Sequence, residues 1–157
     1  MSFAFTEVNE ARIPKILAKY PNRQSALLPL LTLVQRQEGH VSAEAMAEIG
    51  KRLELSPAYV QSVASFYTMY HFQPTGKYII LFCINISCQL RGADNLVEYT
   101  AGKLGIKVGE TTPDRKYTLK REECLAACCN APMMRVNDKY YEDLTKEKID
   151  QILATLP

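Results

Sequence analysis

The first 73 residues place apolar side chains at the spacing of amphipathic helices. Leu27, Leu31 and Val34 fall on one face of a predicted helix, which Gly39 is expected to end. Ser42 is expected to cap the next helix, and a serine–proline pair the one after it. The predicted helices span residues 11–19, 24–37, 43–53 and 57 to 66 or 70. Short helices joined by brief loops are typical of a small bundle.

The hydrophobic period changes after Pro74. A largely continuous β-branched and aromatic run follows, which predicts a buried strand that leads directly to Cys83. Gly105 is expected to end the next helix, an Asn137-Asp138 turn to close a hairpin, and Thr145 to cap the last helix. The predicted strands cover residues 77–82, 117–120, 133–136 and 139–142, and the predicted helices residues 90–104 and 146–156.

The order of strand, helix, strand, hairpin and closing helix matches a thioredoxin-like α/β layer. We therefore expect an α+β protein of two domains. An N-terminal small helical bundle at residues 1–73 is followed by a thioredoxin-like α/β domain at residues 74–157.

The composition is that of a folded globular protein. Of the 157 residues, 47% are hydrophobic and 23% charged, and a net charge of +2 gives no reason to expect a nucleic-acid partner. The longest apolar runs, such as Tyr78 to Phe82, are too short to span a membrane. The N-terminus has the pattern of neither a secretory signal nor a transit peptide, so we expect a cytoplasmic protein with reduced thiols.

All five cysteines lie in two short runs, CINISC and CLAACC. Cys83 and Cys88 are spaced C-x4-C, and Cys124 and Cys128 are spaced C-x3-C. A cluster of two irons and two sulfides needs four thiolates, two on each iron. Each pair must then come from a loop that converges on one metal, and three or four intervening residues permit that. Two such loops at adjacent strand ends would suit a binuclear cluster.

Other thiol chemistries fit the same cysteines less well. Structural zinc is the first alternative, because zinc sites use cysteine pairs up to C-x4-C, although the isoleucine-rich INIS segment is unlike the polar turns of zinc knuckles. A dithiol oxidoreductase normally has C-x2-C at a helix start, which neither run has. Disulfides suit a chain without an export signal poorly. Cys129 is expected to pack as a small buried residue, since free cysteine is commonly buried, and the alternative is a spare ligand or a weak S–H donor toward a cluster sulfur. Adjacent side chains in extended chain point apart, so Cys128 and Cys129 are not expected to bind the same iron.

Residues outside the two cysteine runs offer weaker candidates. His40 and His71 would suit a Rieske-like scheme in which two histidines replace two cysteines, but four cysteines make that unnecessary. The aromatic-rich run from Phe66 to Phe72 is expected to pack in the core, with a docking surface as the alternative. Arg91 is expected to be a surface charge.

Four longer runs give the chain a specific resemblance to a known family. They are VASFYTMYHFQPTGKY, CINISCQLRGA, LGIKVGETTPD and ECLAACCNAPMMRVNDKYYEDLT. The C-terminal part resembles the thioredoxin-like [2Fe-2S] ferredoxins. From roughly Pro21 onward the chain resembles the 24-kilodalton-type subunit of respiratory complex I and of bacterial NADH:quinone oxidoreductase. The resemblance implies an electron-transfer subunit with one [2Fe-2S] cluster, whose ligands would be Cys83, Cys88, Cys124 and Cys128.

The resemblance also implies a partner and a location. The partner would be the flavin- and NADH-binding subunit of the same complex, whose flavin exchanges single electrons with the cluster. FMN and NADH would lie on that partner, because this chain has neither a GxGxxG motif nor P-loop spacing, and no catalytic residue of its own is expected. The implied location is peripheral, on the cytoplasmic face of the bacterial inner membrane, without direct membrane insertion. An NAD-linked hydrogenase or formate dehydrogenase is the alternative host, and a structural zinc interaction module is the alternative of another class.

The surroundings of the cysteines give two further expectations. Backbone amides of residues 84–87 and 125–127 are expected to donate to ligand sulfurs, and apolar neighbours such as Ile84, Ile86 and Met133 to exclude water. The chain departs from the family at Ala126, where glycine is common, and at Cys129, where a small residue without a thiol is common.

Overall fold

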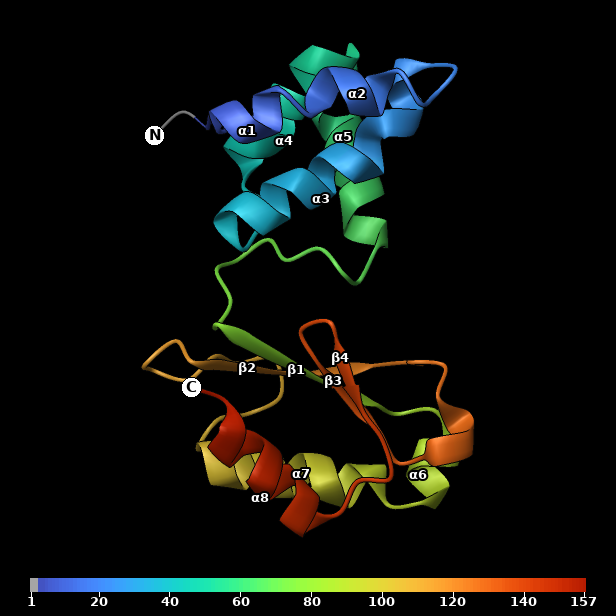
Figure 1. The fold of residues 1–157 in the computed structure, drawn as a ribbon, viewed down its shortest axis with the longest axis vertical. Helices are drawn as coiled ribbons and strands as arrows, with labels where there is room; N and C mark the ends of the chain where they lie inside the picture. Colours follow the sequence, from blue (N-terminus) through green and yellow to red (C-terminus); the bar gives the residue numbers. More distant parts are fainter. Residues whose placement is uncertain (1–2) are drawn as a thin grey trace. The chain divides into compact units, whose positions relative to one another are not determined.

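The structure is a computed structural model that describes residues 3–157. The chain divides into two compact units, the first ending at Pro74 and the second beginning at Thr75 (Figure 1). The expected α+β class is confirmed, with a helical first unit and a second unit that combines helices with a four-stranded sheet. No helix in the described part of the chain is both long and apolar enough to cross a membrane.

The first unit is a set of short helices around one buried apolar cluster. Its elements are α1 (Glu7–Glu10), α2 (Ile13–Leu17), a 3₁₀ turn (Arg23–Ala26), α3 (Leu27–Glu38), α4 (Ala43–Leu53) and α5 (Pro57–Phe66). The predicted cap at Ser42 is confirmed, because its hydroxyl accepts a hydrogen bond from the amide of Ala45 at 3.2 Å. Gly39 ends α3 as predicted, in the left-handed conformation with a φ of 75°.

The bounds of two predicted helices of this unit are wrong, and each of the two contains a proline. The helix expected over residues 11–19 is replaced by α1 and α2, because Pro14 has no amide to continue the ladder. The helix expected over residues 24–37 begins as a 3₁₀ turn and becomes α-helical at Leu27. Pro29 therefore lies in the first turn of α3, where amides have no intrahelical partner in any case, and no kink is required.

The aromatic run after α5 is buried only in part. Tyr70 is buried and donates its hydroxyl hydrogen to the carbonyl of Leu28 at 2.9 Å. Phe66 is 80% exposed, and Met69 and Phe72 are exposed as well. The expectation that this run packs in the core is therefore wrong for most of its length, because α5 ends at Phe66 and no regular period continues beyond it.

The second unit is a mixed four-stranded sheet with helices. Its elements are β1 (Tyr78–Cys83), α6 (Ile86–Leu90), α7 (Ala93–Leu104), β2 (Tyr117–Glu122), a 3₁₀ turn (Cys128–Asn130), β3 (Met134–Val136), β4 (Lys139–Tyr141) and α8 (Lys146–Thr155). The strand order is β2-β1-β3-β4, with β1 and β2 parallel and the other pairs antiparallel. The predicted β3–β4 hairpin is confirmed, and Thr145 caps α8 by accepting from the amide of Lys148 at 3.2 Å.

The helix predicted over residues 90–104 is wrong at its start. The chain forms the short helix α6 immediately after β1, and α7 begins only at Ala93. Gly92 separates the two with a φ of 84°, a conformation that glycine adopts without steric strain. Gly105 ends α7 as predicted, again in the left-handed region.

Alternate residues of β1 belong to different cores, because successive strand residues point to opposite faces. Ile80 and Phe82 are buried with residues of α7 and α8, the two helices that cover the same face of the sheet (Figure 1). Leu81 and Cys83 belong to a second buried cluster, together with Cys88. The sheet therefore presents the first cysteine on the face away from α7 and α8.

Candidate metal centre

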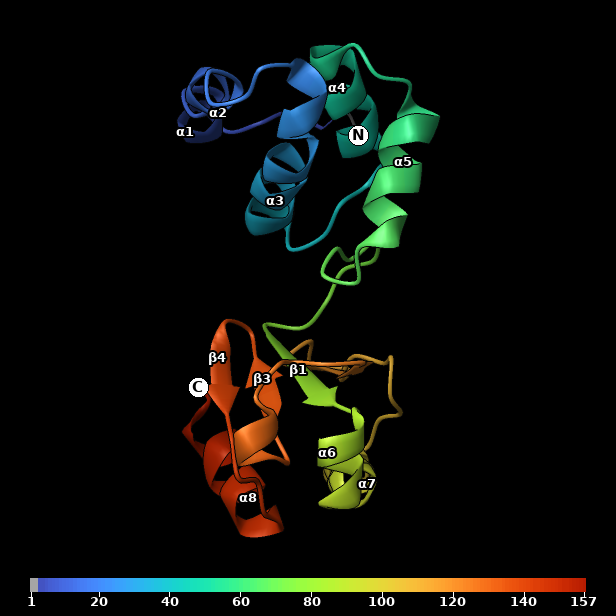
Figure 2. The ribbon, with the colours of Figure 1, turned by 90° about the vertical axis from the view of Figure 1, so that its right-hand side faces the viewer.

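The two cysteine pairs follow the carboxyl ends of neighbouring parallel strands. β1 ends at Cys83, which lies opposite Glu122, the last residue of β2. Cys124 follows two residues later. Parallel neighbours end at the same edge of a sheet, so both cysteine runs begin side by side. Figure 2 shows β1 leading into α6 at this edge.

Cys83 and Cys88 form the buried half of the site. Each residue is 1% exposed, and both belong to an apolar cluster with Leu125 and Met133. The two thiols share a hydrogen bond. Burial, and after it the hydrogen bond with Cys83, raises the pKa of the Cys88 thiol to about 11. In the chain without a metal, this thiol therefore remains protonated at neutral pH.

Cys88 lies on a helix, which corrects the expectation that each pair sits in a loop. Asn85 precedes α6 in an extended conformation, and Cys88 is the third residue of the helix, within its first turn. Ile86, on the same helix, is 62% exposed, and Leu90 is 81% exposed. Ile86 therefore does not exclude water from the cysteines as expected, whereas Met133 is fully buried beside them.

Cys124 and Cys128 form the exposed half of the site. Between them Ala126 adopts a left-handed conformation with a φ of 59°. Its amide donates a hydrogen bond to the Sγ of Cys124 at 3.3 Å. Cys128 lies near enough to the Cys88 thiol for the two groups to interact electrostatically. The exposed pair thus approaches the buried pair at least through Cys128.

The expected hydrogen bonds from backbone amides to cysteine sulfurs are found only in part. The amide of Ala126 donates to a cysteine sulfur, but the amide of Ile84 donates to the carbonyl of Glu122 at 3.0 Å. Ile84 continues the strand pairing for one residue beyond β1, and this occupies its amide.

Cys129 is exposed, so the expectation that it packs as a small buried residue is wrong. The assumption of extended chain at this point is also wrong, because Cys128–Asn130 is a 3₁₀ turn. Neighbouring side chains on a 3₁₀ helix still diverge, by about 120°, because three residues complete a turn. The two adjacent thiols therefore point in different directions from one short turn.

The donor set fits a binuclear iron–sulfur cluster. Within residues 3–157, no three His, Cys, Asp or Glu side chains are arranged to hold a single metal ion. A binuclear cluster requires only two thiolates for each iron, and the chain offers two thiol pairs at one sheet edge. Buried apolar neighbours and an N–H to sulfur hydrogen bond are both features that tune such clusters.

His40 and His71 belong to the first unit, and the cysteines belong to the second. The Nδ1 atom of His40 lies 3.1 Å from the carbonyl oxygen of Glu38. The amide of His71 donates to the side-chain oxygen of Gln35 at 2.7 Å. Both histidines thus have local partners within the helical unit.

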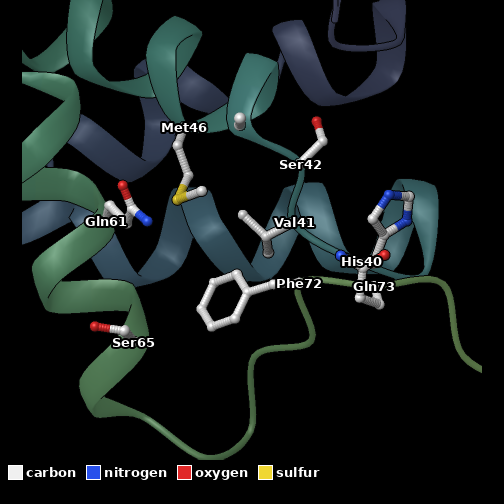
Figure 3. A pocket seen from close by; sticks show the side chains of 9 residues that line it. His40, Val41, Ser42, Met46, Gln61, Ser65, Phe72 and Gln73 are labelled. Atoms are coloured by element: carbon white, nitrogen blue, oxygen red, sulfur yellow. The ribbon is translucent and has the colours of Figure 1, made fainter.

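The first unit also has a pocket of about 320 Å³ beside His40. Figure 3 shows Val41, Met46 and Phe72 directed toward one another in it, with polar side chains such as Gln61 around them. The sequence did not predict this pocket, because its lining comes from separate segments between His40 and Gln73 that only the folded helices bring together. It contains no cysteine and no acidic side chain.

Comparison with known proteins agrees with the thiol chemistry. Residues 13–157 match the family described as thioredoxin-like [2Fe-2S] ferredoxin. NADH dehydrogenase [ubiquinone] flavoprotein 2, mitochondrial, of Dictyostelium discoideum is 46% identical over 162 residues, which cover 99% of this chain and 66% of that protein. The chain thus spans just under two thirds of that relative. A subunit of the NADH-quinone oxidoreductase of Rickettsia prowazekii is 45% identical over 157 residues, which cover 97% of this chain and 88% of that protein.

A solved structure shows the same fold. A chain of an NAD+-reducing [NiFe]-hydrogenase in the air-oxidized state superposes with a TM-score of 0.73 over 87% of this chain and 24% of the hydrogenase chain. Sequence identity is 23%, so this likeness concerns the fold alone. Given the family match along residues 13–157 and relatives above 40% identity over nearly the whole chain, this chain belongs to the thioredoxin-like [2Fe-2S] ferredoxin family.

Proposed function

We propose that this chain is an electron-transfer subunit of the NADH dehydrogenase module of an NADH:quinone oxidoreductase. The observation that carries the proposal is the placement of two cysteine pairs after the carboxyl ends of neighbouring parallel strands, in a chain that aligns almost fully with the NADH-quinone oxidoreductase subunit of Rickettsia prowazekii. When bound, a [2Fe-2S] cluster supplies one-electron oxidation and reduction. The ligands in this proposal are Cys83, Cys88, Cys124 and Cys128.

The two halves of the site serve different needs of an electron carrier. Leu125 and Met133 shield Cys83 and Cys88 from water, and a dry surrounding influences the reduction potential of a cluster. The exposed pair, by contrast, leaves one side of the site open. A carrier needs such an open side, because its electron partner must approach the cluster.

The proposal places the flavin and NADH on a partner subunit and the chain on the cytoplasmic face of the membrane, held there by its complex. The names of the relatives support an NADH dehydrogenase as host. The hydrogenase structure supports the fold and does not by itself favour a hydrogenase host.

The test is to isolate the partner and ask whether it delivers electrons from NADH. The tagged chain is purified without air from the cells that make it, and the co-purifying protein is analysed for flavin and nickel. We expect a flavin-containing partner in whose presence NADH bleaches the visible absorption of the cluster, while the separated chain does not respond to NADH. A cluster that NADH fails to reduce in the flavin-containing complex would refute the proposal. A partner with nickel would assign the chain to a hydrogenase instead.

A further inference from the structure

The face of the sheet that presents Cys83 also presents several charged side chains. In the register, Leu81 lies between Lys120 of β2 and Arg135 of β3, and Cys83 lies beside Glu122. Paired residues share a face, and a residue two positions along the partner strand is a diagonal neighbour within reach of long side chains. Arg135 is such a diagonal neighbour of Cys83, because the amide of Cys83 donates to the carbonyl of Met133.

The charges around Cys83 are not equally compensated. Burial lowers the pKa of Lys120, and the charge of Glu122 acts in the opposite direction, so these two groups lie near each other and offset one another. Arg121 belongs to the other face of β2 and lies 3.8 Å from the carboxylate of Asp94. Each of these cations thus has an acidic neighbour.

Arg135 differs from both. It is half-buried, and its Nε atom is the one buried side-chain nitrogen or oxygen without a hydrogen-bond partner in residues 3–157. None of the ion pairs in the described chain includes it. A guanidinium remains protonated at all accessible pH values, so Arg135 places a positive charge on the ligand-bearing face. The register also makes Glu142 a diagonal neighbour of Arg135, but the two form no ion pair.

We propose that Arg135 raises the reduction potential of the cluster that Cys83 helps to hold. Reduction adds one negative charge at the site, and a cation on the neighbouring strand that is held in no ion pair stabilises that charge. The proposal rests on the proposed function, because it requires a cluster. Its sequence signal is the alternation in MMRVN, which sets an arginine on the opposite face from its buried neighbours Met134 and Val136.

The test is a redox titration of the purified chain, followed by low-temperature EPR and visible absorption. Arg135→Met removes the charge and keeps most of the length, whereas Arg135→Lys keeps the charge. We expect Arg135→Met to lower the equilibrium constant for reduction about threefold to tenfold, which is a shift of about 30 to 59 mV toward negative potential for one electron. Arg135→Lys should stay close to the parent chain.

Arg121→Met is the matched control, because it removes the same net charge from β2 at a residue whose charge is already paired. We expect its shift to be clearly smaller than that of Arg135→Met. Arg135→Gln replaces the methionine variant if that variant does not assemble a cluster. Equal potentials in the parent chain and the neutral variant, or equal shifts for Arg121 and Arg135, would overturn this inference alone. A parent chain without iron and sulfide would instead overturn the proposed function.

Discussion

The Cys88 thiol should react with an alkylating reagent about 100-fold more slowly in the folded, cluster-free chain than in the unfolded chain. The perturbation is removal of the cluster with a chelator under reducing conditions. Folding raises the pKa of this thiol from 9.0 to about 11, mainly through burial. Only the thiolate reacts, so at pH 8 the reactive fraction falls from about 10% to about 0.1%. The 1% exposure of the residue slows access further.

The sign of the pH dependence follows from the direction of the shift. The folded-state pKa is raised, so the protonated thiol persists up to about pH 11. The alkylation rate of Cys88 should then keep rising between pH 9 and 11, by about 50-fold in total, whereas in the urea-unfolded chain it levels off near pH 9.

The assay is a timed pulse of iodoacetamide from pH 7.5 to 11.5, with each cysteine peptide quantified by mass spectrometry. Cys124, which is exposed, reports that the reagent is active in each sample. Rates for Cys88 that agree within threefold between folded and unfolded chain would refute the buried, hydrogen-bonded arrangement of Cys83 and Cys88. A plateau at pH 9 in the folded chain would refute it equally.

Two further predictions concern the ligand set and the helices. Cys128→Ala should abolish iron binding while Cys129→Ala retains it, as measured by iron content and EPR, and an iron-free Cys129→Ala protein would contradict the assignment. Gly50→Ala should lower the free energy of unfolding by about 1–2 kcal/mol in urea titrations, because the added Cβ would lie 2.7 Å from the carbonyl oxygen of Leu55. Gly102→Ala, whose Cβ would meet nothing within 4 Å, should instead raise it by about 1 kcal/mol, and equal signs for the two glycines would contradict this packing.

Local chemistry made much of the fold predictable. The capping serines, the glycines at helix ends and the Asn-Asp hairpin turn act within a few residues, so their effect is readable in the sequence. Ser42, Gly39 and Gly105 accordingly lie where the sequence placed them. The parallel register of β1 and β2 is a non-local feature, and it became visible only in the structure.

The features that the sequence did not predict lack such a local signal. α6 is five residues long and has no side-chain cap, so neither its period nor its start is evident in ISCQL. The exposure of Phe66 and Ile86 was not predictable either, because whether an apolar side chain is covered depends on its neighbours in the folded chain and not on its residue type. Arg135 could not be recognised from the sequence as a neighbour of the cysteines, because only the strand register shows that it lies diagonal to Cys83.

The most direct test of the account is the iron and sulfide content of the chain purified without air, together with its EPR spectrum after reduction by dithionite. We expect two irons and two sulfides per chain, a visible spectrum that bleaches on reduction, and a signal from one unpaired spin. A colourless protein that contains one zinc ion and no sulfide would contradict it.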